Sequence, residues 1–166
     1  MRRIGLLSDT HGYLHPGIKG FFEEVDEIWH AGDIGDLKII EELEELKPVR
    51  AVFGNVDGRE IYDKYPEDQR FNCEEVKVWM THIGGYPGRY SARVKPLIHA
   101  NPPDLFICGH SHILKIMPDN KLNLLHINPG ACGRQGWHKV KTLLRFSLHK
   151  GKVENLEVIE LKDGKK

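Results

Sequence analysis

Seven side chains that could bind metal ions lie directly after apolar runs of the sequence. His110 and His112 are two residues apart, a spacing that puts both side chains on one side of an extended segment. Asp9 and His11 repeat this spacing near the N-terminus. In chain order, the whole set is Asp9, His11, Asp33, Asn55, His82, His110 and His112.

The apolar runs before these residues have the length and composition of β-strands. They cover residues 4–7, 28–31, 49–53, 76–80 and 105–108. In an open α/β sheet the crevice lies beyond the carboxyl ends of the strands, so five strand ends could build a single site. Glycine beside four of the five groups suits a backbone that bends tightly or approaches ions and phosphate closely.

The donor set indicates a pair of metal ions. Two aspartates, one asparagine oxygen and four imidazoles exceed the four ligands of a closed zinc site, and no cysteine belongs to the set. Seven ligands suit two divalent ions that share a carboxylate. Mixed oxygen and nitrogen donors suit Mn, Ni, Co, Fe or Zn, and manganese is the first choice.

Each motif also has an interpretation that involves no metal. An isolated Asp-x-His is more often a capped turn than a ligand pair, and Gly-Asp and Gly-Asn are common turn signals. The pair His110-x-His112 is the strongest single signal. Taken together and in this order, the five motifs favour the metal site.

The ordered motifs resemble those of the calcineurin-like metallophosphoesterase superfamily, and the short chain is most similar to its small YfcE-type phosphodiesterase branch. The motifs are Asp-x-His, Gly-Asp-x-x-Asp, Gly-Asn, Thr-His and Gly-His-Ser-His. The resemblance implies that one ion is held by Asp9, His11 and His112. It implies that a second ion is held by Asn55, His82 and His110, and that Asp33 bridges the two.

Neighbouring residues have lesser expected roles, of which the resemblance implies only that of Asp36. Asp36 completes the Gly-Asp-x-x-Asp motif and would support the site without binding metal. His30 could orient a ligand, or it could be a buried polar residue of its strand. Arg89 and Tyr90 could contact a phosphate oxygen, or they could begin a helix. Roles other than metal binding are expected for the remaining histidines, His15, His99, His126, His138 and His149.

Val56 stands where many family members carry a histidine that can protonate the leaving alkoxide. Valine cannot carry a proton, so the general acid is unassigned and Asp57 is the candidate helper. Small members of the branch often share this loss, with aspartate in the next position. Ile83 follows His82 where glycine is commoner, and it is expected to reshape the loop of residues 84–90.

Two such ions suit the hydrolysis of a phosphate ester. They can lower the pKa of a shared water and stabilise the attacking and leaving oxygens of an in-line displacement. The hypothesis is a dinuclear metal-dependent phosphodiesterase for small phosphodiesters, in which a metal-bridged hydroxide attacks phosphorus. The expected catalytic residues are Asp33, Asn55, His82 and Asp57.

Other functions fit the same motifs less well. A phosphomonoesterase would use the same metal site, and the missing family histidine favours diesters only modestly. A non-catalytic protein-binding scaffold is a further alternative, because a retromer subunit resembles this fold with a degraded metal site. Here all seven ligand positions are filled. Metal storage or sensing lacks support, since the site resembles one left open for substrate.

Charge and cysteine usage limit the partners. The chain has 166 residues with 24 basic and 24 acidic side chains, so its formal net charge is zero. This balance argues against a general nucleic-acid surface, which needs a basic footprint. The three cysteines, Cys73, Cys108 and Cys132, are odd in number and widely spaced, which predicts neither a disulfide framework nor a thiolate zinc site.

The two ends of the chain suggest a protein without a membrane partner. A predicted strand begins almost at once, and no apolar stretch approaches the roughly 20 residues of a membrane span. A cytoplasmic protein is therefore expected, and Lys162, Lys165 and Lys166 are expected to form a solvated tail. Small phosphoesterases of this kind often self-associate, so a homo-oligomer is an option that the sequence leaves open.

The predicted elements indicate a single α/β domain over residues 1–166. Helices are predicted at residues 17–25, 37–46 and 90–99, and hairpin turns at Asp119-Asn120 and Lys150-Gly151. The residues alone predict an α/β fold with an antiparallel C-terminal part. The resemblance implies a four-layer α/β/β/α sandwich of two mixed β-sheets flanked by helices.

Overall fold

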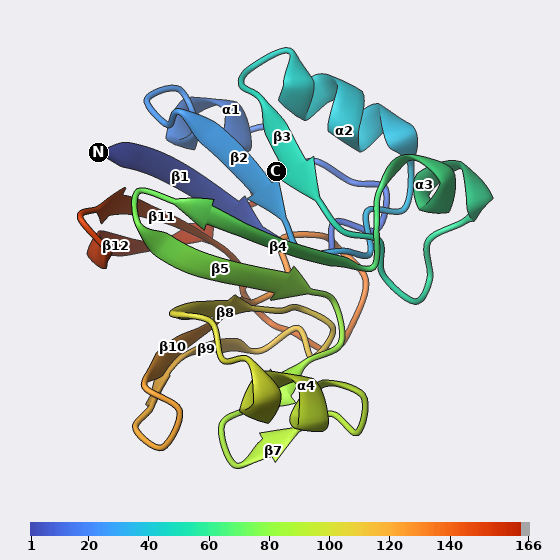
Figure 1. Ribbon diagram of the computed structural model, residues 1–166. Helices are drawn as coiled ribbons and strands as arrows, with labels where there is room; N and C mark the ends of the chain where they lie inside the picture. The colour runs from blue at the N-terminus through green and yellow to red at the C-terminus, as the bar shows by residue number, and fades with distance from the viewer. Residues whose placement is uncertain (164–166) are drawn as a thin grey trace.

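Two five-stranded β-sheets lie face to face in the computed structural model, which describes residues 1–163 (Figure 1). The first sheet has the strand order β12 (Lys152–Leu161), β11 (Lys141–His149), β1 (Arg2–Leu7), β2 (Glu27–His30) and β3 (Val49–Ala51). The second has the order β4 (Asp68–Cys73), β5 (Val76–Thr81), β8 (Leu105–Ile107), β10 (Leu124–Pro129) and β9 (Leu114–Asp119). Parallel pairing joins β1, β2 and β3, and likewise β5, β8 and β10, whereas the other strands pair antiparallel. Both sheets are therefore mixed.

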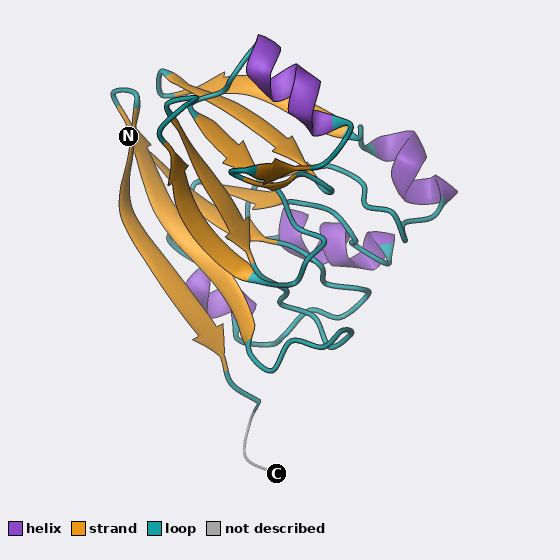
Figure 2. Cartoon of the chain, turned by 90° about the horizontal axis from the view of Figure 1, so that it is seen from below, coloured by secondary structure: helices purple, strands orange, loops and turns teal. Residues whose placement is uncertain are grey.

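Helices cover the outer faces of the two sheets. They are α1 (Ile18–Phe21), α2 (Leu37–Glu44), α3 (Arg59–Lys64) and α4 (Val94–Ala100). In Figure 1, α1 and α2 lie above the first sheet and α4 lies below the second. Figure 2 shows the two sheets from below, with loops gathered at one end of the strands. The expected four-layer α/β/β/α sandwich is confirmed.

Three apolar clusters hold these layers together. Trp29 of β2 and Met80 of β5 belong to the cluster between the two sheets, and both are fully buried. Trp79, one residue earlier, packs instead with Ile98 of α4, because successive strand residues point to opposite faces. Leu43 of α2 belongs to the third cluster, on the outer face of the first sheet. Each fully buried large side chain of this kind contributes about 1.5–3 kcal/mol of stability.

All three predicted helices differ from the structure in their bounds, and the one predicted at residues 37–46 differs least, since α2 ends at Glu44. The helix predicted at residues 17–25 is reduced to α1, which ends at Phe21 with Phe22 as its C-cap. The helix predicted at residues 90–99 begins only at Val94. Tyr90 lies instead in β7 (Arg89–Tyr90), which pairs with β6 (Gly85–Tyr86). Its hydroxyl donates a 2.7 Å hydrogen bond to Asp119, which holds the segment in place.

Both predicted turns lie between antiparallel strands. Lys150 and Gly151 join β11 to β12 with φ angles of 46° and 78°, as a two-residue hairpin turn with two left-handed residues requires. The turn after Asp119 is longer than the predicted pair, since β10 begins at Leu124. The carboxylate of Asp119 closes this turn by accepting the backbone N–H groups of Lys121 and Leu122.

The C-terminal lysines fall on both sides of the last described residue. Lys165 and Lys166 lie outside the described residues. Lys162 is not part of a free tail, because its carbonyl accepts a 2.9 Å hydrogen bond from Nε2 of His15. The side chain of Lys162 is exposed, as expected, but its backbone is held in place.

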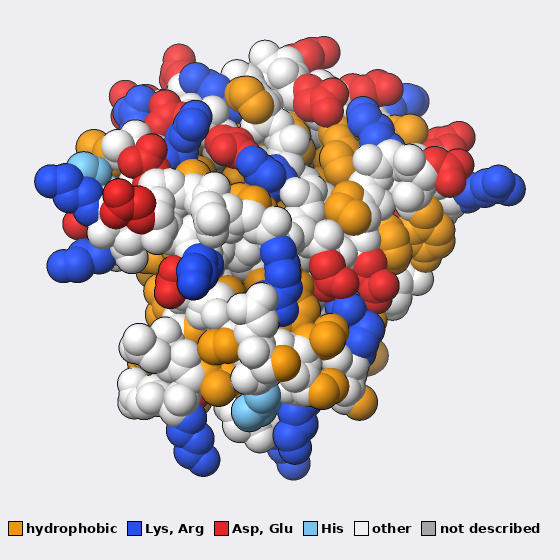
Figure 3. Space-filling view, in the orientation of Figure 1, with side chains coloured by type: hydrophobic (Ala, Val, Ile, Leu, Met, Phe, Trp, Pro, Cys, Tyr) orange, Lys and Arg blue, Asp and Glu red, His pale blue; other side chains and the backbone are white. Residues whose placement is uncertain are grey.

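The distribution of charge on the surface agrees with the equal numbers of acidic and basic side chains. Figure 3 shows acidic and basic side chains interspersed over the upper part of one face.

Within residues 1–163, all three cysteines are free thiols, with Cys108 and Cys132 buried. No helix in this part of the chain is long and apolar enough to cross a membrane.

His126 gives the fold a dependence on pH that does not involve the metal-binding motifs. It is 1% exposed in β10, and burial lowers its pKa to about 4 from 6.5. The unfolded chain therefore binds a proton more readily, so stability is complete above about pH 6.5 and falls as the pH drops towards 4. Between about pH 7.5 and pH 4.5 we expect this group to remove about 2 kcal/mol of unfolding free energy.

The measurement is urea unfolding of the wild type and of His126→Leu at both pH values. Between the two pH values, the unfolding free energy of the variant should fall by about 2 kcal/mol less than that of the wild type. An equal loss in both proteins would show that His126 does not carry this acid sensitivity.

Candidate metal centre

The seven predicted ligands all follow the carboxyl ends of strands that pair in parallel, and the structure brings them to one end of the sandwich. Those with acidic or imidazole side chains form two groups, each with ligand atoms within 4.8 Å of one another. The first group is Asp9, His11, Asp33 and His112, and the second is Asp33, His82 and His110. Asp33 belongs to both groups. Asn55 lies beside the second, because its side-chain oxygen is 3.0 Å from Nδ1 of His110.

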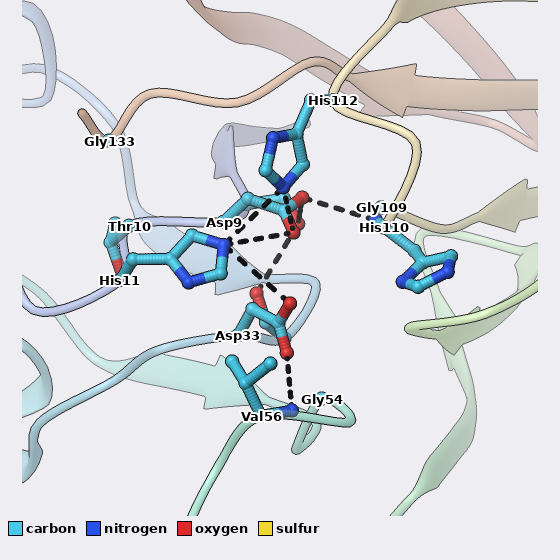
Figure 4. Close-up of polar contacts among 12 residues, drawn as sticks. Asp9, Thr10, His11, Asp33, Gly54, Val56, Gly109, His110, His112 and Gly133 are labelled. Carbon is cyan, nitrogen blue, oxygen red and sulfur yellow. Dashed lines mark hydrogen bonds and ion pairs between the residues drawn. The ribbon is translucent and has the colours of Figure 1, made fainter. Parts of the chain in front are cut away.

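The first group surrounds one oxygen of Asp9. Nε2 of His112 is 3.2 Å from Oδ1 of Asp9, and Nε2 of His11 is 3.8 Å from the same atom. The two imidazole nitrogens are 3.3 Å apart, and Nε2 of His11 is also 3.6 Å from Oδ2 of Asp33. In Figure 4 both rings and both carboxylates turn towards one shared space. Such convergence is what ligands of a single cation require.

The second group lies on the other side of Asp33. Nε2 of His82 is 3.1 Å from Oδ2 of Asp33 and 3.7 Å from Oδ1 of Asp9. Oδ1 of Asp33 accepts the backbone N–H of Val56 at 3.1 Å, which leaves Oδ2 for the space between the groups. His110 is exposed, and its ring lies to one side in Figure 4. Substrate can therefore approach from the side of the second group.

Two buried polar atoms in this space have no hydrogen-bond partner among the described residues. They are Oδ1 of Asp9 and Nε2 of His82. Nδ1 of His82 donates to the carbonyl oxygen of Ala31 at 2.8 Å, so in the neutral ring Nε2 presents its lone pair to the carboxylates. Two carboxylates, 0% and 2% exposed, also lie side by side. Burying these groups is unfavourable unless a cation lies among them, so the residues fit a divalent metal.

The closeness of these carboxylates and imidazoles also shifts several of their pKa values. Burial opposes ionisation of Asp33, but its interactions with His82 and the Val56 N–H outweigh burial and lower its pKa. Burial would lower the pKa of His82, yet the carboxylates of Asp33 and Asp9 raise it. The carboxylate of Asp9, 3.2 Å from the His112 ring, raises the pKa of His112. The negative charge of the two aspartates thus attracts positive charge to the centre.

Five of the seven predicted ligands have left-handed backbone conformations. The φ angles are 55° at Asp9, 47° at His11, 54° at Asp33, 72° at His110 and 63° at His112. Non-glycine residues rarely adopt such angles, which cost about 1 kcal/mol or more each. The surrounding contacts therefore hold these loops in shapes that present the side chains to a common centre.

Close backbone approach explains two of the glycines in the motifs. A Cβ atom at Gly109 would collide with the hydroxyl of Ser8, and one at Gly54 would collide with the carboxylate of Asp33. The Ser8 hydroxyl itself donates to Oδ2 of Asp9 at 2.7 Å, and the N–H of His110 donates to the same oxygen at 3.2 Å. These two bonds leave only Oδ1 of Asp9 facing the centre.

His30 supports the ligand loops and is not a ligand. Its Nδ1 accepts the N–H of Gly32 at 3.1 Å, and its Nε2 lies 2.9 Å from the hydroxyl of Thr10. Burial lowers its pKa to about 3, so the ring is neutral. Since Thr10 separates Asp9 from His11 and Gly32 precedes Asp33, His30 fixes two ligand loops against each other.

Asn128 supports the third ligand loop in a similar way, a role that the sequence did not reveal. Its side-chain amide donates to the carbonyl of Gly109 at 2.9 Å and to the hydroxyl of Ser111 at 3.1 Å. Its side-chain oxygen accepts the N–H of Gly130 at 3.0 Å. The Asn-Pro-Gly sequence at 128–130 was the only available signal for this role.

Several other predicted residues lie outside the centre. Asp36 caps α2, where its carboxylate accepts the N–H of Lys38 at 2.9 Å. Tyr90 donates its hydroxyl to Asp119, and burial together with this bond raises its pKa. Arg89 is exposed in β7. None of these three residues belongs to either of the two ligand groups.

Asp57 has a different place from the one predicted. Its carboxylate is 4% exposed and accepts three backbone N–H groups, from Gly54 at 2.7 Å, Gly35 at 2.8 Å and Ile34 at 3.2 Å. These bonds tie the loop that carries Asn55 to the loop that carries Asp33. The prediction of a leaving-group helper is therefore corrected to a positioning role.

Asp57→Asn tests this correction. Loss of the charge that receives three N–H donors should lower the unfolding free energy by about 2–3 kcal/mol. Turnover should fall by the same factor for 4-nitrophenyl and alkyl diesters, because a displaced loop affects both alike. A proton donor would matter far more for the alkyl leaving group, and such selectivity would restore the original prediction. Asp63→Asn, on the exposed face of α3, is the matched control.

The family follows from the sequence match. Residues 1–151 match the calcineurin-like phosphoesterase superfamily domain. The chain belongs to this superfamily. The predicted class, a metal-dependent phosphoric ester hydrolase, is confirmed, and family membership implies divalent metal ions at the centre.

Two curated proteins are similar to this chain over most of its length. The chain is 33% identical over 133 residues to a probable metallophosphoesterase of Methanothermobacter thermautotrophicus, covering 77% of this chain and 76% of that protein. It is 30% identical over 149 residues to a phosphodiesterase of Methanocaldococcus jannaschii, covering 78% of this chain and 84% of that protein. Each match therefore covers most of both proteins.

Solved structures share the fold. A novel archaeal phosphodiesterase is 26% identical with a TM-score of 0.74, covering 96% of this chain and 99% of that one. Vps29 of Chaetomium thermophilum is 12% identical with a TM-score of 0.77, covering 97% of each chain. The second likeness shows the fold alone.

Proposed function

We propose that the chain hydrolyses small phosphodiesters at a dinuclear metal centre, by in-line attack of water on phosphorus. The observation that supports this most is the sharing of Asp33 by two adjacent ligand groups. One ion would be held by Asp9, His11, Asp33 and His112, and the other by Asp33, Asn55, His82 and His110. Manganese is the first choice, with Ni, Co, Fe or Zn as alternatives.

Bound there, divalent ions supply the Lewis acidity that activates water and neutralises charge on the phosphoryl oxygens. The chain supplies position and charge. Asp33 contributes one carboxylate to both groups, and the Val56 N–H fixes its orientation. The bond from His82 to Ala31 keeps the Nε2 lone pair directed at the centre. Preorganised ligands of this kind are held before substrate arrives, which is what lowers the barrier.

The surroundings of the second group suit a substrate with two organic arms. A groove of about 270 Å³ next to Asn55 and His82 is lined in part by Phe53 and Ile83. Val56, the residue after Asn55, is apolar and 55% exposed. No protonatable side chain stands at position 56, so a leaving group that needs little protonation is favoured. An apolar groove and a missing acid both favour diesters over monoesters.

The experiment compares hydrolysis of bis(4-nitrophenyl) phosphate and 4-nitrophenyl phosphate. Chelator-stripped protein receives Mn, Ni, Co, Zn or Mg singly. We expect activity restored by metal, with a larger kcat/KM for the diester. A larger value for the monoester would make the protein a phosphomonoesterase. Full occupancy by metal without hydrolysis of either ester would favour a protein-binding scaffold.

A further inference from the structure

A basic groove of about 770 Å³ lies next to the first ligand group. Four chain segments build it: the segment after His11, the loop between β10 and β11, the start of β11, and the end of β12. Its lining residues are Tyr13, His15, Pro16, Arg134, His138, Lys139, Lys141, Lys162 and Asp163.

The groove begins at the metal ligands themselves. The His138 ring lies 5.2 Å from the His112 ring, centroid to centroid, and nearly perpendicular to it. The N–H of Gly133 donates to the carbonyl of Asp9 at 3.2 Å, which brings the β10–β11 loop onto the first ligand loop. Figure 4 shows Gly133 on the same side of the centre as Thr10. A ligand bound to the first group therefore has the groove beside it.

The groove concentrates positive charge in a chain whose net charge is zero. Four of its lining residues are cations, namely Arg134, Lys139, Lys141 and Lys162, against the single carboxylate of Asp163. Lys141 pairs with that carboxylate at 2.9 Å. Among residues 1–163, no carboxylate lies within ion-pair distance of the other three cations. Lys141 first, and then His15 and Arg134, lower the pKa of Asp163, in agreement with a positive local potential.

Contacts across the groove hold its walls. The guanidinium of Arg134 lies 3.7 Å from the centre of the Tyr13 ring, which places its charge on the wall nearest His11. Nε2 of His15 donates to the carbonyl of Lys162 and thereby fixes the end of β12. Nε2 of His138 donates to the carbonyl of Gly133 at 2.8 Å. Unpaired cations on fixed walls are suited to bind a phosphate group through charge-assisted hydrogen bonds.

We infer that the natural substrate is a phosphodiester that carries an additional phosphate group, and that this basic groove binds the additional phosphate. The inference rests on the proposed function, because the scissile diester must lie at the metal centre for its second phosphate to reach the groove. Arg134 and Lys139 are the main contacts, since both are exposed and neither has a carboxylate partner among residues 1–163. A substrate without the second phosphate would leave these cations unused.

A second basic pocket provides a matched control. It lies between β7, α4 and the β9–β10 turn, and Lys95 and Lys121 line it. Neither lysine belongs to the metal centre or to the basic groove. The double variants Arg134→Ala/Lys139→Ala and Lys95→Ala/Lys121→Ala each remove two exposed positive charges, so they differ in location and not in net charge.

The first test uses chelator-stripped protein and inorganic phosphate, so it does not depend on hydrolysis. Phosphate is titrated while backbone amide shifts are followed by NMR. We expect saturable shifts at residues 134–139 that are lost in Arg134→Ala/Lys139→Ala and kept in Lys95→Ala/Lys121→Ala. No saturable shift in this segment, or equal shifts in both variants, would overturn the inference.

The second test compares the dinucleotides pTpT and TpT, which differ by one terminal phosphate, as competitive inhibitors of bis(4-nitrophenyl) phosphate hydrolysis. We expect pTpT to bind about tenfold more tightly in the wild type, the gain from one charge-assisted hydrogen bond. The ratio should approach one in Arg134→Ala/Lys139→Ala and stay near tenfold in the control. Phosphate binding in the groove without this preference would assign the groove to free phosphate and contradict the inference. A failure of the proposed function is distinct, because bis(4-nitrophenyl) phosphate would then not be hydrolysed at all.

Discussion

Asp33→Asn should lower kcat/KM for a phosphodiester by about a thousandfold. Asp33 is the only residue that belongs to both ligand groups among residues 1–163, with Oδ2 at 3.1 Å from His82 and 3.6 Å from His11. An amide removes the negative charge that Oδ2 presents to both groups, and a neutral amide oxygen holds two cations far less tightly. Losses of about 10²–10³ follow the removal of a single preorganised electrostatic group, and the loss of a shared ligand lies at the upper end.

The control for this variant is Asp36→Asn, the same change three residues later. Asp36 is exposed and caps α2, and asparagine is as good a cap as aspartate. Metal content, thermal unfolding and kcat/KM are measured for both variants. Asp33→Asn should fold but bind less metal, whereas Asp36→Asn should resemble the wild type. Near-normal kinetics in Asp33→Asn would remove the bridging role.

His82→Ala should have the second largest effect, a fall in kcat/KM of about a hundredfold or more. His82 is the only buried imidazole of the second group, and its Nε2 has no hydrogen-bond partner among the described residues. Without it, the second ion would depend on Asp33 and on the exposed His110 and Asn55. The metal content of the variant, measured after dialysis, should fall towards one equivalent per chain.

His126→Gln is the matched control for His82→Ala. Both histidines are buried: His126 lies in β10 and is 1% exposed, and His82 follows β5 and is 2% exposed. His126 packs against Phe106, away from the centre. The control should change stability and leave metal content and turnover as they are. Equal losses of metal in both variants would attribute the effect of His82→Ala to general destabilisation and not to a lost ligand.

The sequence predicted which residues form the metal centre, because their positions depend on local features of the chain. Apolar runs that end in polar residues become strands with polar ends, and parallel strands of one sheet present those ends at the same edge. This places Asp9 beside Asp33 and His82 beside His110 without knowledge of any contact. The four-layer sandwich, in contrast, came from the resemblance, since residue patterns alone predicted only an α/β fold.

The supporting residues depend on tertiary contacts that no local pattern contains. Asp57 follows a ligand motif and therefore resembles a catalytic carboxylate. Its carboxylate oxygens, however, accept the backbone N–H groups of residues 34 and 35, more than 20 positions away. The start of α4 was misplaced because Tyr90 bonds to Asp119, 29 residues later. His15 was expected to have a role other than metal binding, but its bond to Lys162, which spans 147 positions, could not be predicted.

The central claim is that two ions, bound by these residues, act together on a phosphodiester. The most direct measurement is a titration of chelator-stripped protein with Mn, in which bound metal and hydrolysis of bis(4-nitrophenyl) phosphate are followed in the same samples. The account predicts two bound equivalents per chain, with activity that appears mainly as the second one binds. Full activity at one equivalent, or two bound equivalents without hydrolysis, would contradict it.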